Sequence, residues 1–159
     1  MKESIYLKPL EFKITFPIVT LQIMIDHCPD ELWNDKKYGF AIREHLQQAI
    51  SGGFFHLKDE NKIIFEEPYE KEVSLEIYFD PKENISKDEI KKHFIELREM
   101  ILREWFKDRD DNWLIEKSKI NSKITNYDTL LSTIEVFNFQ LGNIFAILNI
   151  NNAIFNENN

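Results

Sequence analysis

Hydrophobic residues recur at helical spacing along four long stretches of the chain. The clearest stretch is the last, from Thr125 to about Ile150, where apolar residues follow one another at intervals of three and four and therefore share one side of an α-helix. These residues are Leu130, Ile134, Phe137, Leu141, Ile144 and Leu148. Thr125 followed by Asp128 has the spacing of a capping box, which predicts where this helix begins.

Two earlier helices are predicted on the same grounds, from about Pro9 to Cys28 and from about Phe40 to His56. The expected core stripe of the first is Phe12, Phe16, Val19, Ile23 and His27, widened by Ile18, Leu21 and Ile25. The expected stripe of the second is Ile42, Leu46, Ala49, Ile50 and Gly53. Its start lacks a good cap, because Ala41 stands where a serine is expected.

A further helix is predicted from a second capping box, Ser86 with Glu89, to about Lys107. Its apolar stripe is Ile90, Phe94, Leu97, Ile101 and Trp105. Four amphipathic helices in one chain predict an all-α fold, a four-helix bundle that forms a single domain over residues 1–159. The asparagine-rich tail, about 151–159, is expected to fray.

The stretch between the second and third of these long helices, about 58–85, lacks the helical period. Val73, Leu75, Ile77 and Phe79 alternate with other residues, which favours a strand, and Ile63–Phe65 is its expected partner in a small β-hairpin. The alternative is an extended insertion that packs along the helices.

Composition narrows the classes of function. The chain has 159 residues, 43% of them hydrophobic, and a net charge of −8, so its average surface repels nucleic acid and anionic membranes. Cys28 is the only cysteine, which excludes an internal disulfide and a paired-cysteine zinc site. No stretch resembles a signal peptide or a membrane span, and a cytoplasmic protein is expected.

A second face of the last helix carries the candidate chemistry. Val136 and Gln140 lie four residues apart on this face, the spacing at which two histidines on one helix hold a metal ion. Neither side chain is a useful metal ligand. Asn143 and Ile147 continue the same face.

Three motifs together resemble the DinB/YfiT-like superfamily. They are LQIMIDHCPDELW (Leu21–Trp33), GFAIREHLQQAISGGFFHL (Gly39–Leu57) and LLSTIEVFNFQLGNIFAIL (Leu130–Leu148). The resemblance implies a four-helix bundle, commonly a homodimer, that holds a metal with three histidines. The corresponding positions here are Gln48, Val136 and Gln140, so all three ligands are replaced.

The resemblance therefore predicts a metal-free protein without a cofactor. In this hypothesis Gln48, Gln140, His45 and Asn143, beside Val136, line a polar pocket at the former metal site, and the protein binds a small molecule or a partner. The alternative is an active metal-dependent enzyme, similar to a thiol transferase or hydrolase, with non-standard ligands such as His45 and a carboxylate of Glu44 or Glu135. A third hypothesis is a dimerisation scaffold. Expected partners are a second copy of the chain and a small molecule, with neither nucleic acid nor a membrane.

Overall fold

The computed structural model describes residues 4–57, 72–73, 76–77 and 85–151. Over these residues the fold is all-α, as predicted, and is built on four long helices: α1 (Leu7–His27), α3 (Ile42–Leu57), α4 (Lys87–Ile101) and α6 (Asn126–Ile150). Smaller elements join them: helices α2 (Asp30–Trp33) and α5 (Asp111–Ile115), and a π-helical segment, η1 (Leu102–Phe106), that continues α4.

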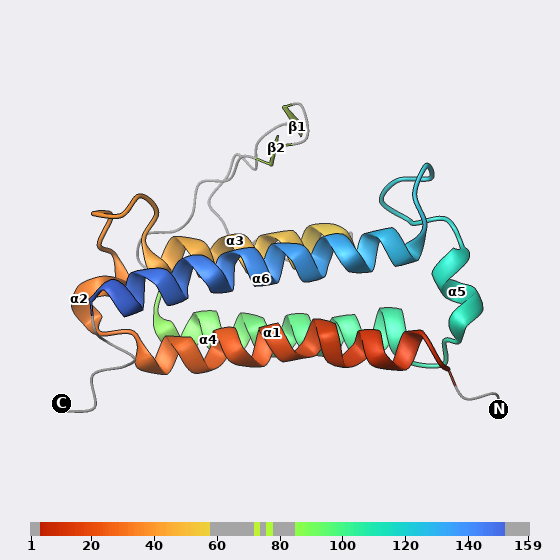
Figure 1. The fold of residues 1–159 in the computed structure, drawn as a ribbon, viewed down its shortest axis with the longest axis horizontal. Coiled ribbons are helices and arrows are strands. Elements are labelled where there is room, and N and C mark those ends of the chain that lie inside the picture. The colour runs from red at the N-terminus through yellow and green to blue at the C-terminus, as the bar shows by residue number, and fades with distance from the viewer. Residues whose placement is uncertain (1–3, 58–71, 74–75, 78–84, 152–159) are drawn as a thin grey trace.

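The long helices lie in two layers (Figure 1). One layer holds α3 and α6 and the other holds α1 and α4, and each helix also packs against one helix of the opposite layer. Followed from N- to C-terminus, α1 and α6 run in one direction and α3 and α4 in the other. The α3–α6 contact, which is antiparallel, is the most extensive of these.

The helix starts are fixed by side chains. Both predicted capping boxes form, because the hydroxyls of Ser86 and Thr125 accept hydrogen bonds from the third helical N–H of α4 and α6. At the start of α3, Ala41 offers the first helical N–H groups no side-chain acceptor, as expected, but the Glu44 carboxylate accepts the Ala41 N–H at 3.1 Å, which is one half of a capping box. A distant residue caps α1: the Asp111 carboxylate accepts the N–H groups of residues 5–7 and the Ser4 hydroxyl.

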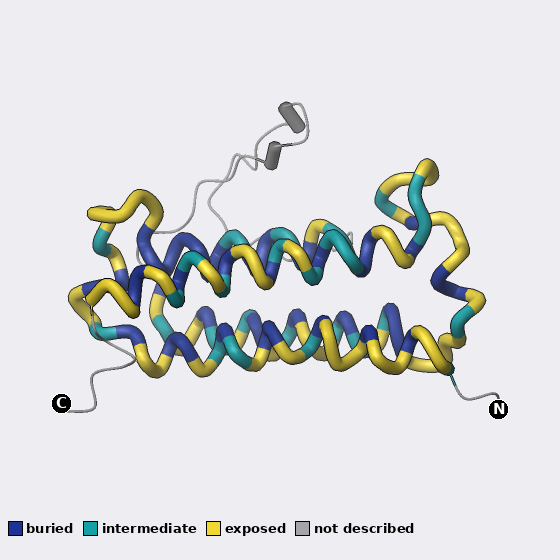
Figure 2. Tube along the Cα trace, viewed as in Figure 1, coloured by how far each residue is buried: buried dark blue, intermediate teal, exposed yellow. Residues whose placement is uncertain are grey.

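Figure 2 shows that buried residues recur along all four long helices of the two layers. The stripe predicted for α3 is buried, and so is the one predicted for α4 and η1. On α6, Leu130, Phe137, Ile144 and Leu148 are fully buried, and Ile134 and Leu141 pack against the core at its edge.

The main stripe predicted for α1 is wrong, because it faces solvent, whereas the three residues predicted to widen it, Ile18, Leu21 and Ile25, are fully buried. Phe12 is 65% exposed, Phe16 56%, Val19 37% and Ile23 47%, and His27 is also exposed. The buried face is instead Leu7, Leu10, Ile14, Pro17, Ile18, Leu21, Met24 and Ile25. Helical period alone does not decide which of two apolar faces of one helix meets the core.

A short hairpin lies between α3 and α4. Strands β1 (Glu72–Val73) and β2 (Glu76–Ile77) pair antiparallel, with Glu72 opposite Ile77 and Val73 opposite Glu76. The prediction of one strand from Val73 to Phe79 is therefore wrong, because the chain turns back on itself inside that run. The expected partner strand, Ile63–Phe65, and most of the tail fall outside the described residues.

Two adjacent glycines let α3 approach its neighbours closely. A Cβ on Gly52 would lie 2.8 Å from Val136 Cγ1 on α6, and one on Gly53 would lie 2.7 Å from Leu97 Cδ2 on α4. Both distances are shorter than an ordinary carbon contact, so a larger residue at either position would force the neighbouring side chain to shift. Close packing offsets the low helix propensity of this pair.

Within the described residues, α6 is the one helix long and apolar enough to span a membrane, judged by length and composition alone. Core helices of soluble proteins meet the same criterion, and α6 packs here against α1, α3 and α5.

Candidate functional site

The α3–α6 contact brings three of the five predicted site residues together. Gln140 of α6, which is 6% exposed, lies between two side chains of α3. Its Nε2 donates to Gln48 Oε1 at 2.8 Å, and its Oε1 lies 2.6 Å from His45 Nδ1. Since the Gln140 oxygen accepts, this network assigns the His45 proton to Nδ1 and leaves Nε2 as an acceptor.

The other two predicted residues lie at the margin of this polar cluster. Val136 is half-buried one turn away on α6, where its Cγ1 packs onto Gly52. Asn143 is also half-buried, but its Nδ2 donates to the Phe139 carbonyl of its own helix at 3.1 Å. The hydrogen-bonded cluster in the described part of the chain is therefore His45, Gln140 and Gln48.

The cluster is suited to hydrogen bonding. Amide oxygens are neutral and are weak ligands of transition metals. His45 is the single imidazole of the cluster. Among the described residues, no group of three or more His, Cys, Asp or Glu side chains has the geometry to hold a metal ion. The expected carboxylate partners of His45 lie elsewhere, since Glu135 is exposed and Glu44 bonds to Ala41, Lys36 and Arg43.

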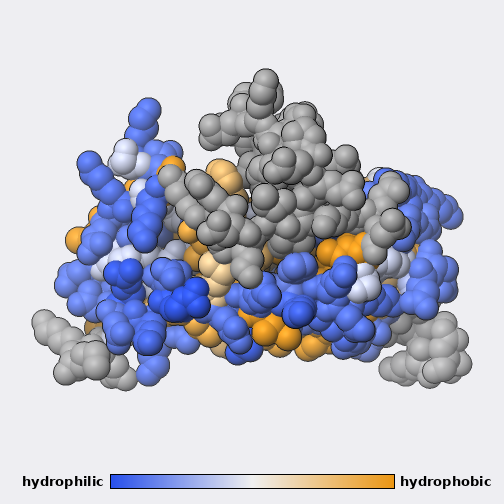
Figure 3. Space-filling model, turned by 180° about the vertical axis from the view of Figure 1, so that it is seen from behind, coloured by the Kyte–Doolittle hydropathy of each residue, from blue (hydrophilic) through white to orange (hydrophobic). Residues whose placement is uncertain are grey.

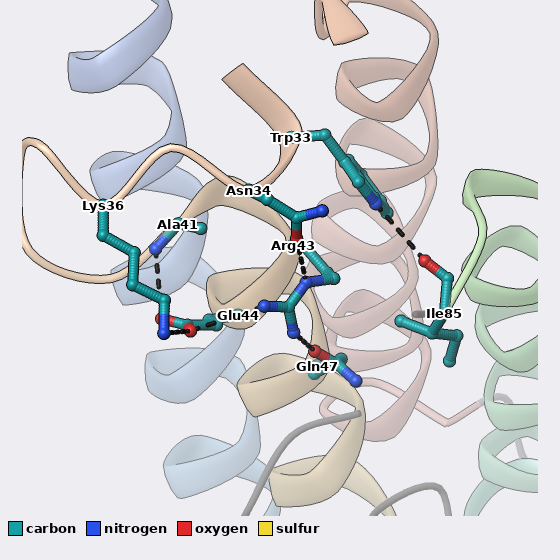
Figure 4. A network of polar contacts seen from close by, with 8 residues as sticks. All are labelled: Trp33, Asn34, Lys36, Ala41, Arg43, Glu44, Gln47 and Ile85. Carbon is teal, nitrogen blue, oxygen red and sulfur yellow. Dashed lines mark hydrogen bonds and ion pairs between the residues drawn. The ribbon is translucent and has the colours of Figure 1, made fainter. Parts of the chain in front are cut away.

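A buried charged network holds the start of α3, from which His45 and Gln48 project (Figure 4). Arg43 is 1% exposed. Its Nε donates to Asn34 Oδ1, and its Nη1 donates to Gln47 Oε1 at 2.6 Å. Its Nη2 lies 3.4 Å from Glu44 Oε1. Lys36 approaches the same Glu44 oxygen at 2.9 Å. A buried charge must be paired and hydrogen-bonded, so this network fixes the register of α3 against the segment before it.

Sequence reasoning missed this network. The one available signal was the spacing of Arg43 and Gln47, four residues apart on a helix, which allows an intrahelical hydrogen bond. The pairing of Arg43 with Asn34 depends on the path of the connecting segment, which the helical period does not describe.

Farther along the same contact, His56 of α3 meets Thr133 of α6. His56 Nδ1 lies 2.7 Å from Thr133 Oγ1, and that hydroxyl donates to the Thr129 carbonyl at 2.8 Å. Thr133 therefore accepts from His56, which again leaves Nε2 as an acceptor. Burial lowers the pKa of His56 to about 4, so the ring is neutral near pH 7.

Cys28 does not offer a reactive nucleophile. Burial raises the pKa of its thiol to about 11, with a smaller opposing effect from Lys87. The group is a neutral thiol at neutral pH, and buried protonated thiols react slowly.

Comparison of the chain with protein-family models, with curated proteins and with solved structures finds no match. The resemblance to the DinB/YfiT-like superfamily therefore rests on the three sequence motifs.

Proposed function

We propose that the chain is a DinB/YfiT-like four-helix bundle in which a polar cluster has replaced the family's metal site, and that this cluster binds a small molecule. The observation that carries the proposal is the Gln140–Gln48 hydrogen bond across α3 and α6. The resemblance assigns both residues to metal-ligand positions, and ligands of one metal must lie within reach of one another. The third such position, Val136, packs one turn away against Gly52.

The arrangement of the helices also supports the proposal. The four long helices pack in two layers, with α3 and α6 antiparallel. Sites in helical bundles are built from inward side chains on facing helices, as His45, Gln48 and Gln140 are.

The cluster keeps hydrogen-bonding capacity for a ligand. With the bonds to Gln140 made, His45 retains an acceptor at Nε2 and Gln48 retains its amide N–H groups as donors. A small polar molecule that offers one donor and one acceptor matches this pair.

Metal content and co-purified small molecules test this function. Protein purified without a histidine tag is expected to contain no stoichiometric metal, and its melting temperature is expected to be unchanged by Zn²⁺ or Ni²⁺. Mass spectrometry of the denatured protein is expected to release a small molecule from wild type that is absent from Gln140→Leu. Stoichiometric metal, or a metal-induced rise in melting temperature that a chelator reverses, would favour the metal-dependent enzyme instead.

A second candidate function, association with another copy of the chain, is favoured by the outer face of α1. This face carries Phe12, Phe16, Val19 and Ile23, all exposed, and the Phe12 and Phe16 rings lie 5.4 Å apart. Figure 3 shows hydrophobic side chains along the lower edge of the molecule, the edge along which α1 and α4 run in Figure 1. An exposed apolar row of this kind is typical of an interaction surface.

A further inference from the structure

A separate cavity of about 130 Å³ lies at the end of the molecule where α5 connects to α6. Four elements build its walls: the end of α3, η1, α5 with the loop after it, and the first turn of α6. It lies well away from the polar cluster, because Thr129 of the cavity and Gln140 are about 16 Å apart along α6.

The walls are held in place by hydrogen bonds across the loop after α5. Ser118 N–H donates to the Ile124 carbonyl at 2.9 Å, and Asn126 N–H donates to the Glu116 carbonyl at 2.9 Å. The Asn126 side chain donates to the Trp113 carbonyl at 2.8 Å. The cavity is therefore formed before any ligand arrives, which lowers the entropic cost of binding.

Two tryptophans of the cavity carry N–H groups without partners. Trp105 and Trp113 are 7% and 8% exposed, and neither indole N–H has a hydrogen bond within the described part of the chain. Trp33, by contrast, donates to the Ile85 carbonyl at 3.3 Å. Neither indole nitrogen is among the buried atoms that lack a partner in the described residues, so both reach solvent and are free to donate to a molecule in the cavity.

The remaining lining groups specify the complementary chemistry. His56 contributes an acceptor, because its Nδ1–H is already committed to Thr133. The Ser118 hydroxyl accepts from Thr129 and Ile120 N–H, which leaves its own proton to donate.

The charged residues at the rim of the cavity sum to a positive charge, although the whole chain has a net charge of −8. Three cations, Arg109, Lys117 and Lys119, face two carboxylates, Glu104 and Glu116. Arg109 is oriented by its stacking on Trp113, with 5.6 Å between Cζ and the ring centre, and by a bond from Nη2 to the Glu104 carbonyl at 3.4 Å. A planar guanidinium held in this way is suited to a carboxylate.

We propose that this cavity is a second binding site, specific for a small hydroxycarboxylic acid. The carboxylate accepts from the indole N–H groups and from Arg109, the hydroxyl donates to His56 Nε2, and the carbon skeleton contacts the tryptophan rings. The volume sets the size: an apolar protein cavity of about 150 Å³ holds benzene, so this one encloses roughly six non-hydrogen atoms, the size of lactate, and a larger acid such as salicylate must extend into the rim.

Indole N–H signals in nitrogen-15 NMR of the full chain test the site directly, with L-lactate and salicylate as probes and propionate and benzoate as matched acids without the hydroxyl. The Trp105 and Trp113 signals are expected to shift saturably with a dissociation constant below about 1 mM. The Trp33 signal, whose N–H is already bonded, is expected to stay in place. Each hydroxy acid is expected to bind more tightly than its matched acid.

Paired arginine variants provide the control. Arg109→Gln is expected to weaken binding at least about fivefold, whereas Arg103→Gln, an exposed arginine outside the cavity, is expected to change it less than about twofold. Absence of a saturable shift with all four probes at about 20 mM would overturn the proposal. Equal shifts at Trp33, equal effects of the two arginine variants, or equal affinity for acids with and without the hydroxyl would overturn it as well.

Discussion

At the scale of single residues, Gln140 does most to define the site. Its amide is a donor toward Gln48 and an acceptor toward His45, so one side chain of α6 bonds to two side chains of α3. The resemblance to the DinB/YfiT-like superfamily predicted that Gln140 and Gln48 stand at two of the positions where that family has metal ligands. The bond to His45 was not predictable in detail, because it depends on how far α3 and α6 slide past each other.

We expect Gln140→Ala to destabilise the protein by about 1–3 kcal/mol, because the largely buried His45 N–H and Gln48 oxygen lose their partner. Urea unfolding measures the change. Asn143→Ala is the matched control on the same helix, since this side chain bonds only to its own helix backbone. A loss of equal size in both variants would show that the cross-helix bonds add nothing to stability.

His56 gives the protein a specific dependence on pH. Its folded pKa, about 4, lies below the ordinary value of 6.5, so the unfolded chain binds the proton more readily. This stabilising contribution is complete above about pH 6.5 and is lost as the pH falls toward 4. Between about pH 7.5 and pH 5 we expect the unfolding free energy of wild type to fall by roughly 1–2 kcal/mol more than that of His56→Gln. Parallel pH profiles for the two proteins would contradict the assignment.

At the scale of elements, the predictable features were those set by local sequence. The period of three and four located all four long helices, and two capping boxes located the starts of α4 and α6. Contacts between distant segments were not predictable: Asp111 caps α1 from more than 100 residues away. Ser4 and the α1 N–H groups hold the pKa of the Asp111 carboxyl below its usual value.

The closeness of α3 to α4 is tested by Gly53→Ala. Alanine improves helix propensity by about 1 kcal/mol, but its Cβ would collide with Leu97 and Phe137, and overpacking costs about 1–3 kcal/mol. We therefore expect a net loss of stability in thermal or urea unfolding. Gly142→Ala is the control: nothing lies within 4 Å of its Cβ position, and it should stabilise the protein by about 0.5–1 kcal/mol. A stabilised Gly53→Ala would show that the helices are farther apart than described.

At the scale of the whole molecule, the error on α1 has a consequence for assembly. A helix that is apolar on two faces buries one of them in its own core and leaves the other for a partner. In α1 the exposed face contains Phe12 and Phe16, and the fold of a single chain leaves both rings largely in solvent. The sequence showed that both faces were apolar but held no information on which of them would meet the core.

We expect wild type to have about twice the 19.1 kDa chain mass in light scattering, and Phe12→Ser with Phe16→Ser to have the mass of one chain. Ile95→Ser, which changes an apolar side chain on α4 that is 49% exposed, should leave the dimer intact. A monomeric wild type, or a dimer that survives the double substitution, would exclude this face as the interface.

The proposal that these positions once held a metal is tested most directly by placing histidines there with Gln48→His, Val136→His and Gln140→His in one chain. If these positions correspond to the family's ligands, the variant should bind one Zn²⁺ per chain in calorimetry with a dissociation constant below about 1 μM, and a chelator should reverse the stabilisation. The control places histidines at Gln48, Glu135 and Phe139, where the last two are also four residues apart but point to solvent. Binding at least about tenfold tighter in the first variant would support the account. Equal binding, or none in either variant, would contradict it.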